Sequence, residues 1–142
     1  EVGLRGATIA AYNITPDVAV VIDACHGDIP NVPKDSAFEL GKGPAIAVGP
    51  NLHVNLTKKI IDIAKEEEIA YQIEPSPGNT GTDAWAIQVS KTGIPTVLVS
   101  VPLRYMHTTV ETLHLDDLKY SGRLISKFIL SIDDDTGGIS CC

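Results

Sequence analysis

The sequence is poor in cysteine, in aromatic residues and in positive charge, and each shortage excludes a class of protein. Its three cysteines are an odd number, and two of them, Cys141 and Cys142, are adjacent, so they make no disulfide framework. We therefore expect a reducing, cytoplasmic setting. Eleven Lys and Arg against 18 Asp and Glu give a net charge of −7, without a basic cluster. A nucleic acid or an anionic membrane surface is not expected as a partner.

Long apolar runs are also missing, since none approaches the roughly 18 residues of a membrane span. What is present, 142 residues with 44% hydrophobic content, suits a globular domain with one core. We assign residues 1–132 to this domain and residues 133–142 to a flexible tail. The first residue is Glu1 and Met106 is the single methionine. This suggests a piece of a longer protein.

Helical and strand patterns alternate along the chain. A helix is expected from Gly3 or Arg5 to about Asn13, and an edge strand near Phe38 within the Gly- and Pro-rich loop 24–44. Apolar runs predict strands, and amphipathic or N-capped segments predict helices. The predicted strands cover residues 17–23, 45–48, 70–74 and 94–101, and the further helices cover residues 51–68, 80–90 and 116–132. Such alternation predicts a three-layer α/β domain with a mixed, largely parallel sheet.

The stretch from Gly93 to Glu111 combines a buried strand with a polar loop. We expect the strand to end at Pro102 and the polar cluster that contains Arg104 and His107 to follow on the loop. Functional side chains in open α/β sheets gather at such strand ends. A solvated surface loop would have the same composition, so position alone leaves both interpretations open.

Three potential metal ligands lie at the ends of predicted elements: Glu1, Asp23 and His107. Carboxylate and imidazole together suit Zn²⁺, Mn²⁺ or Co²⁺. By the residues alone, a turn or cap role for Asp23 and a loop role for His107 are the more ordinary explanations. No HExxH or CxxC motif joins the three.

Five motifs, in order, give the chain a family resemblance. They are EVGLRGA (1–7), GDIP (27–30), GKGPAI (41–46), TGTDA (80–84) and PLRYMHTTVE (102–111). Together they resemble the catalytic domain of the M42 metallo-aminopeptidases, the glutamyl, deblocking and tetrahedral aminopeptidases. The resemblance implies a zinc-peptidase-like fold with two divalent metal ions (Zn, Co or Mn). It also implies release of N-terminal residues from short peptides, by a homo-oligomer in the full-length form.

The resemblance also implies roles for single residues. It places Glu1 and His107 on one metal ion and Asp23 on the other. It places the general-base glutamate immediately before Glu1, with a histidine ligand and a bridging aspartate further upstream, so this chain contains no general base. We therefore expect the isolated chain to be inactive or nearly so. Thr82 and Asp83 would lie beside the metal site or the substrate.

Three further residues have less definite expectations. Arg104 would either bind a peptide carboxylate or carbonyl, or pair with Glu111. Cys25 and His26 follow Asp23, where the family has a small hydroxylated or acidic pattern, and we interpret them as loop residues without a ligand role.

Two other functions compete with the aminopeptidase. One is a catalytically inactive α/β module that acts through assembly. The other is glycoside hydrolysis by a carboxylate pair, since some members of the family carry a cellulase label. That chemistry needs two carboxyl groups about 5 to 9.5 Å apart around a sugar. Glu1 and Asp23 suit metal ligation better.

Overall fold

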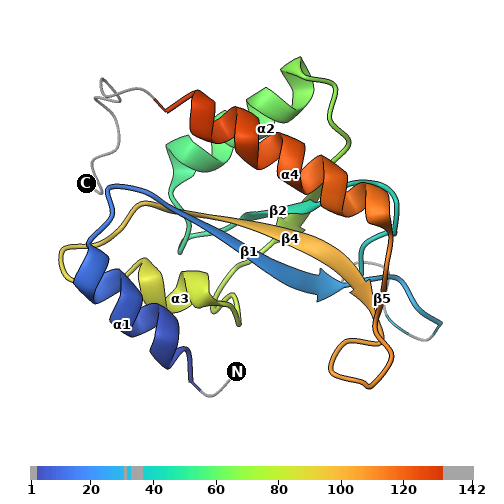
Figure 1. The fold of residues 1–142 in the computed structure, drawn as a ribbon, viewed down its shortest axis with the longest axis horizontal. Coiled ribbons are helices and arrows are strands. Elements are labelled where there is room, and N and C mark those ends of the chain that lie inside the picture. Colours follow the sequence, from blue (N-terminus) through green and yellow to red (C-terminus); the bar gives the residue numbers. More distant parts are fainter. Residues whose placement is uncertain (1–2, 31, 33–36, 133–142) are drawn as a thin grey trace.

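The computed structural model describes residues 3–30, 32 and 37–132 (Figure 1). Glu1 and the predicted tail, residues 133–142, lie outside the described residues. Helices and strands alternate as predicted. In chain order they are α1 (Arg5–Ile14), β1 (Ala19–His26), β2 (Ala45–Val48), α2 (Val54–Glu66), β3 (Gln72–Pro75), α3 (Asp83–Ile87), β4 (Thr96–Arg104), β5 (Thr112–Leu113) and α4 (Leu115–Leu130).

The strands form one mixed sheet in the order β1-β4-β2-β3, with β5 paired to the end of β4. β1 is parallel to β4, and β2 is parallel to β3, whereas β2 is antiparallel to β4. Ser100 on β4 is level with Asp23 on β1 and with Ala45 on β2. The sheet therefore brings residues from distant parts of the sequence to the same level.

Helices cover both faces of the sheet, with α2 and α4 on one side and α1 and α3 on the other (Figure 1). Alternate residues of β4 serve the two cores, since Val97 and Val99 pack with α2 and α4, and Leu98 packs with Ala84 of α3. This arrangement confirms the predicted three-layer α/β fold. Among the described residues, no helix is both long and apolar enough to cross a membrane.

Two strand boundaries were predicted wrongly. β1 continues three residues past Asp23, to His26, and β4 runs through Pro102 to Arg104. The two strands pair in parallel along their whole common length, from Ala19 opposite Thr96 to His26 opposite Leu103. Pro102 does not interrupt this pairing. In β4 the carbonyls of odd-numbered residues face β1. The Pro102 nitrogen faces the opposite side of β4, beyond the end of β2, so its missing N–H removes no hydrogen bond to β1.

Other local predictions were partly right. A single bridge between Gly27 and Phe38 marks the expected edge strand. α3 is shorter than predicted, and the two-residue strand β5 was missed. The buried stripe of α4 is narrow, and the apolar residues Leu118 and Ile129 of this helix are exposed.

Candidate functional site

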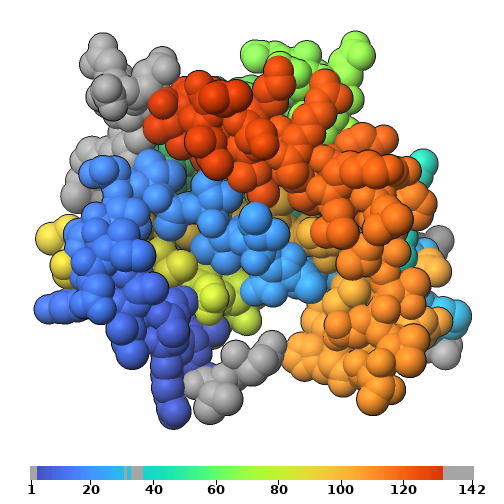
Figure 2. Space-filling view, viewed as in Figure 1, coloured from blue at the N-terminus to red at the C-terminus, as the bar shows by residue number. Residues whose placement is uncertain are grey.

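A cavity of about 500 Å³ opens on the face of the sheet that α3 covers only in part. α3 packs through Ala84 and Ile87 on Val21, Ala47 and Leu98, and leaves the sheet surface beyond them open. Figure 2 shows the surface hollowed below β1, between the start of α1 and the turn after β4. The cavity is lined by Leu4, Ile22, Asp23, Ala24, Cys25, His26, Phe38, Glu74, Thr80, Gly81, Thr82, Asp83, Met106 and His107.

Four of the predicted site residues, from three separate segments, meet in this cavity: Asp23, Thr82, Asp83 and His107. Leu4, from the same motif as Glu1, also lines it. Glu1 itself is among the residues that are not described, so its predicted role stays a prediction. The strand order brings these residues together. β4 lies next to β1 in the sheet, and the segments that follow β3 and β4 lie over the same part of the sheet.

Asp23 and His107 are positioned by different local structures, a strand and a turn. Asp23 lies within β1, not at its end, and its Oδ1 accepts a hydrogen bond from the Ala24 amide at 2.8 Å. His107 lies on the turn after β4, where Tyr105 and His107 both have positive φ angles, 60° and 63°. The Glu111 carboxylate accepts a hydrogen bond from the His107 amide at 2.7 Å. Two left-handed residues in a three-residue turn reverse the chain sharply and return Met106 and His107 to the cavity.

Thr82 and Asp83 reach the cavity because they start α3. The Thr82 hydroxyl is the N-cap and accepts from the Ala84 amide at 3.3 Å. The Thr80 and Thr82 hydroxyls are 2.9 Å apart and share a hydrogen bond. Asp83 occupies the first turn, the favoured place for a carboxylate. The cap therefore fixes both residues at the cavity rim.

Comparison with known proteins supports the resemblance seen in the motifs. The sequence profile described as M42 glutamyl aminopeptidase matches residues 1–124. The chain belongs to the M42 aminopeptidase family. The lysyl aminopeptidase of Pyrococcus furiosus is 42% identical over 118 residues, which cover 83% of this chain and 34% of that protein.

Solved M42 structures share the fold. The TET aminopeptidase of the marine sediment archaeon Thaumarchaeota archaeon SCGC AB-539-E09 superimposes with a TM-score of 0.90 at 34% identity, covering 99% of this chain and 40% of that one. The TET1 peptidase of Pyrococcus horikoshii gives 0.72 at 34% identity, covering 92% and 38%. The chain thus spans about a third to two fifths of the length of these M42 relatives.

Arg104, predicted to serve the M42 site or to pair with Glu111, does not line this cavity. Its guanidinium donates to Asp28, through Nε to the carbonyl and through Nη2 to Oδ1, both at 2.6 Å. The pairing with Glu111 was wrong, since the Glu111 carboxylate binds the His107 amide. The physical reason is the extension of β1. The Gly27 amide donates to the Leu103 carbonyl at 2.8 Å, which brings Asp28 beside Arg104.

Glu74 is the acidic residue of this M42 cavity that sequence reasoning missed. Ser100 Oγ donates to its Oε2 at 2.8 Å. Burial raises the pKa of the Glu74 carboxyl, opposed by the Ser100 hydrogen bond, while the charge of Asp23 raises it further and His26 lowers it. The sequence did contain a signal for it. Glu74 ends a predicted strand, as Asp23 does, and that position was the reason for selecting Asp23.

Cys25 and His26 also lie at the cavity, on β1 instead of in a loop. Burial raises the pKa of the Cys25 thiol strongly, and the charges of Glu74, Asp117 and Asp23 add to the effect. Burial therefore favours the neutral thiol, which is a poor nucleophile.

The donor types in the cavity fit a divalent metal ion, but the described residues do not complete a site. Asp23 and His107 offer an oxygen and a nitrogen donor. Within the described part of the chain, no group of three or more His, Cys, Asp or Glu side chains is arranged to hold a metal ion. Protein zinc sites use three or four such ligands.

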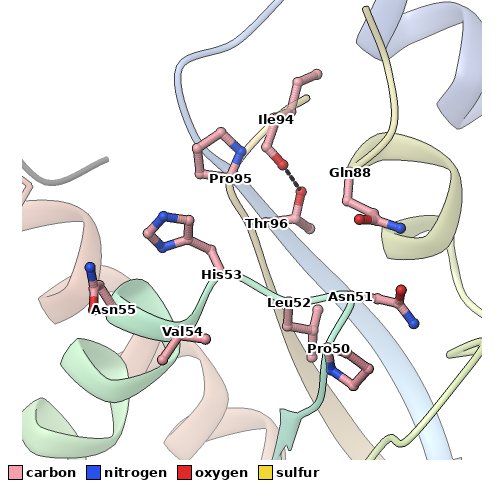
Figure 3. A pocket seen from close by; sticks show the side chains of 10 residues that line it. All are labelled: Pro50, Asn51, Leu52, His53, Val54, Asn55, Gln88, Ile94, Pro95 and Thr96. Atoms are coloured by element: carbon pink, nitrogen blue, oxygen red, sulfur yellow. Dashed lines mark hydrogen bonds between the residues drawn. The ribbon is translucent and has the colours of Figure 1, made fainter. Parts of the chain in front are cut away.

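A second cavity, of about 340 Å³, lies at the amino end of β4 (Figure 3). His53 borders it as the N-cap of α2, with its Nδ1 accepting from the Leu56 amide at 3.3 Å. The Thr96 hydroxyl donates to the Ile94 carbonyl at 2.7 Å. No carboxylate is among the described residues that line this cavity, so it is a poor candidate for the metal site.

Proposed function

We propose that this chain is part of the catalytic domain of a longer M42 aminopeptidase, which uses two divalent metal ions to release N-terminal residues from short peptides. The observation that carries the proposal is the meeting of Asp23, Thr82, Asp83 and His107 in one cavity of an M42 chain. The chain covers 34% to 40% of its M42 relatives, so the remainder of the enzyme would be supplied by further polypeptide.

In this proposal Asp23 belongs to one metal ion, and His107 with Glu1 belongs to the other. Bound metal ions polarise a scissile carbonyl and lower the pKa of a bound water. The chain's own residues position these ligands. β1 fixes the direction of Asp23, Glu111 holds the turn that carries His107, and the Thr82 cap keeps Asp83 at the rim where a peptide would enter.

The general base, a histidine ligand and a bridging aspartate would come from outside the 142 residues. We therefore expect the isolated chain to show little or no peptidase activity and weak metal affinity. The test compares this chain with the longest natural polypeptide that contains it, on aminoacyl-p-nitroanilides with Zn²⁺, Co²⁺ or Mn²⁺. Turnover by the 142-residue chain at an ordinary enzyme rate would contradict the expectation.

In the longer polypeptide, Asp23→Asn and His107→Ala should each lower kcat/KM by about a hundredfold or more, because residues that only support a metal ligand already cost 10- to 100-fold. Asp62→Asn, on the exposed face of α2, is the control and should leave kcat/KM unchanged. Release of reducing sugar from carboxymethylcellulose, without aminopeptidase activity, would instead favour the glycoside hydrolase.

A further inference from the structure

α4 presents two stripes of residues along its length, and only one of them packs on the sheet. The inner stripe contains Leu124 and Phe128, which are both fully buried. The outer stripe repeats apolar or small residues at alternating spacings of three and four, as in a seam between two helices. This α4 stripe consists of Leu115, Leu118, Gly122, Ile125 and Ile129. A helix that packs on one neighbouring layer needs only one such stripe.

The α4 stripe is open along most of its length. Leu115, Leu118 and Ile129 are 67%, 45% and 56% exposed, and Ile125 is partly buried. A Cβ placed on Gly122 would meet none of the described residues within 4 Å, its own helix and chain neighbours apart. Single exposed apolar side chains are ordinary on a protein surface, whereas a contiguous row of them indicates a surface that binds a partner.

The α4 stripe lies on the side of α4 that faces away from α2. Arg123 and Lys127, on the other flank of α4, bind the Glu67 carboxylate at the end of α2, at 3.3 and 2.9 Å. Because successive residues of a helix are about 100° apart, these two side chains lie roughly opposite to Leu118 and Ile129. The helical layer therefore ends at α4, which passes in front of α2 in Figure 1.

The sheet ends on the same side as the helical layer. In the described part of the chain, β1 pairs with β4 and with no other strand. Val20 packs against the core under α2 and α4, so Ile22, two residues further along β1, points to the same face of the sheet. Ile22 is 59% exposed, and at the open edge it also borders the cavity described above. Figure 2 shows β1 uncovered between α4 and α1.

One further helix packed along α4 would cover both features. It would contact the α4 stripe at its side and Ile22 beneath it, and it would continue the helical layer over β1. Such a helix needs an apolar stripe at the same spacing and a polar outer face. The remaining M42 polypeptide is the favoured source, because the sheet and the helical layer end together and the chain covers only 34% to 40% of its relatives.

We propose that the α4 stripe and the adjoining face of β1 bind an amphipathic helix from the remaining part of the M42 polypeptide. The inference rests on the proposed function only in so far as that proposal makes this chain part of a longer enzyme. A second copy of this chain is the other occupant that the experiment separates.

The test measures whether Ile129 is covered in the longest natural polypeptide that contains this chain. Ile129→Cys introduces a thiol on the α4 stripe, and Leu130→Cys introduces a matched thiol at the next residue, which is 79% exposed and off the stripe. Peptide mapping after maleimide labelling separates both from the natural cysteines. In the longer polypeptide the thiol from Ile129→Cys should react about tenfold or more slowly than that from Leu130→Cys. In the 142-residue chain the two rates should be similar.

Thermal unfolding of Ile129→Gln and Leu130→Gln gives a second measurement. In the longer polypeptide Ile129→Gln would bury an amide without a partner, and should lower Tm by about 4 °C or more relative to Leu130→Gln. In the 142-residue chain the two variants should differ by less than about 2 °C, because both positions are exposed.

Equal labelling rates at the two positions of the longer polypeptide would overturn the inference. Protection of the Ile129→Cys thiol in the 142-residue chain that rises with protein concentration would assign the surface to a second copy, and would overturn it as well. Neither measurement depends on peptidase activity. Absence of turnover on every aminoacyl substrate would therefore overturn the proposed function alone.

Discussion

Cys25 and Glu74 share a wall of the cavity, and burial opposes charge on both side chains. The thiol is neutral and serves as a small buried apolar group, although it lies two residues from Asp23. Glu74 differs because Ser100 donates a hydrogen bond to it. At the scale of single residues, the chemistry depends on what surrounds each group. A carboxylate with a fixed donor on one oxygen, and no hydrogen bond to its other oxygen among the described residues, is available for binding, whereas a buried thiol is not.

This environment predicts how stability depends on pH. The pKa of Glu74 is raised in the folded chain, so the folded state holds its proton more tightly than the unfolded state. Stability should therefore fall as pH rises from the unfolded value near 4.5 through the folded pKa, and stay lower above it. Glu74→Gln removes this effect and should stabilise the isolated chain at pH 7. The gain should be about 1.4 kcal/mol for each unit by which folding raises the pKa of Glu74.

The measurement is urea unfolding of wild type and Glu74→Gln at several pH values. The two should converge below about pH 4, where both states of the wild type are protonated. An equal difference at pH 4 and pH 7 would show that the ionisation of Glu74 is not its cause. Glu66→Gln, at an exposed position on α2, provides the comparison.

At the scale of elements, helix starts and loops are held by side chains that take no part in the proposed chemistry. The side chains of His53 and His114 cap the first turns of α2 and α4. The loop before β2 is fixed to α4 by Asp117, which is fully buried and accepts from the Gly41 and Gly43 amides, both at 2.8 Å. Gly43 has φ +88° and would place a Cβ 1.9 Å from the Ala70 carbonyl oxygen, so only glycine fits there.

Asp117→Ala should lower the free energy of unfolding by about 2 to 6 kcal/mol, because two amides lose their acceptor and each such loss costs about 1 to 3 kcal/mol. Asp117→Asn keeps one acceptor oxygen and should cost less. Chemical denaturation measures both variants. Asp62→Ala breaks only an exposed pair with Lys65 and should change stability by less than about 0.5 kcal/mol. Equal costs for Asp117→Ala and Asp117→Asn would contradict this account.

At the scale of the whole molecule, the sheet has an open edge. β1 pairs with β4 on one side, and no other strand pairs with it among the described residues. Ile22, in the middle of β1, is 59% exposed. An apolar edge strand with free backbone groups favours association between chains. We therefore expect the isolated chain to self-associate through this edge.

Ile22→Lys should reduce this association, because a lysine on an edge strand opposes pairing, and should leave stability nearly unchanged at an exposed position. Light scattering against concentration measures the first effect and thermal unfolding the second. Val54→Lys, at an exposed residue at the start of α2, is the control for added charge. If both variants reduce association equally, net charge and not the β1 edge controls it.

The resemblance to the M42 family predicts a homo-oligomer for the longer polypeptide. The related TET1 peptidase of Pyrococcus horikoshii assembles into a tetrahedron or a large octahedral shell. Size-exclusion chromatography with multi-angle light scattering would give the mass of the longer polypeptide. A monomer at micromolar concentration would contradict the prediction.

The sequence by itself determined the local elements and the family. β2 was predicted at residues 45–48, as observed, and the helix predicted over residues 51–68 contains the shorter observed α2, because apolar runs and helical periodicity are properties of neighbouring residues. The five motifs predicted the M42 family and pointed to Asp23, Thr82, Asp83 and His107, which line one cavity. Their roles in metal and substrate binding stay predictions.

Only the tertiary structure decided where β1 and β4 end, which partner Arg104 has, and that Glu74 belongs to the site. β1 and β4 support each other's last residues through hydrogen bonds between strands about 77 positions apart, from Ala19 and Thr96 onward. That same pairing brings Asp28 to Arg104. Glu74 reaches Ser100 only because β2 lies between their strands and presents alanine there. Such contacts depend on strand order and register, which local sequence patterns do not encode.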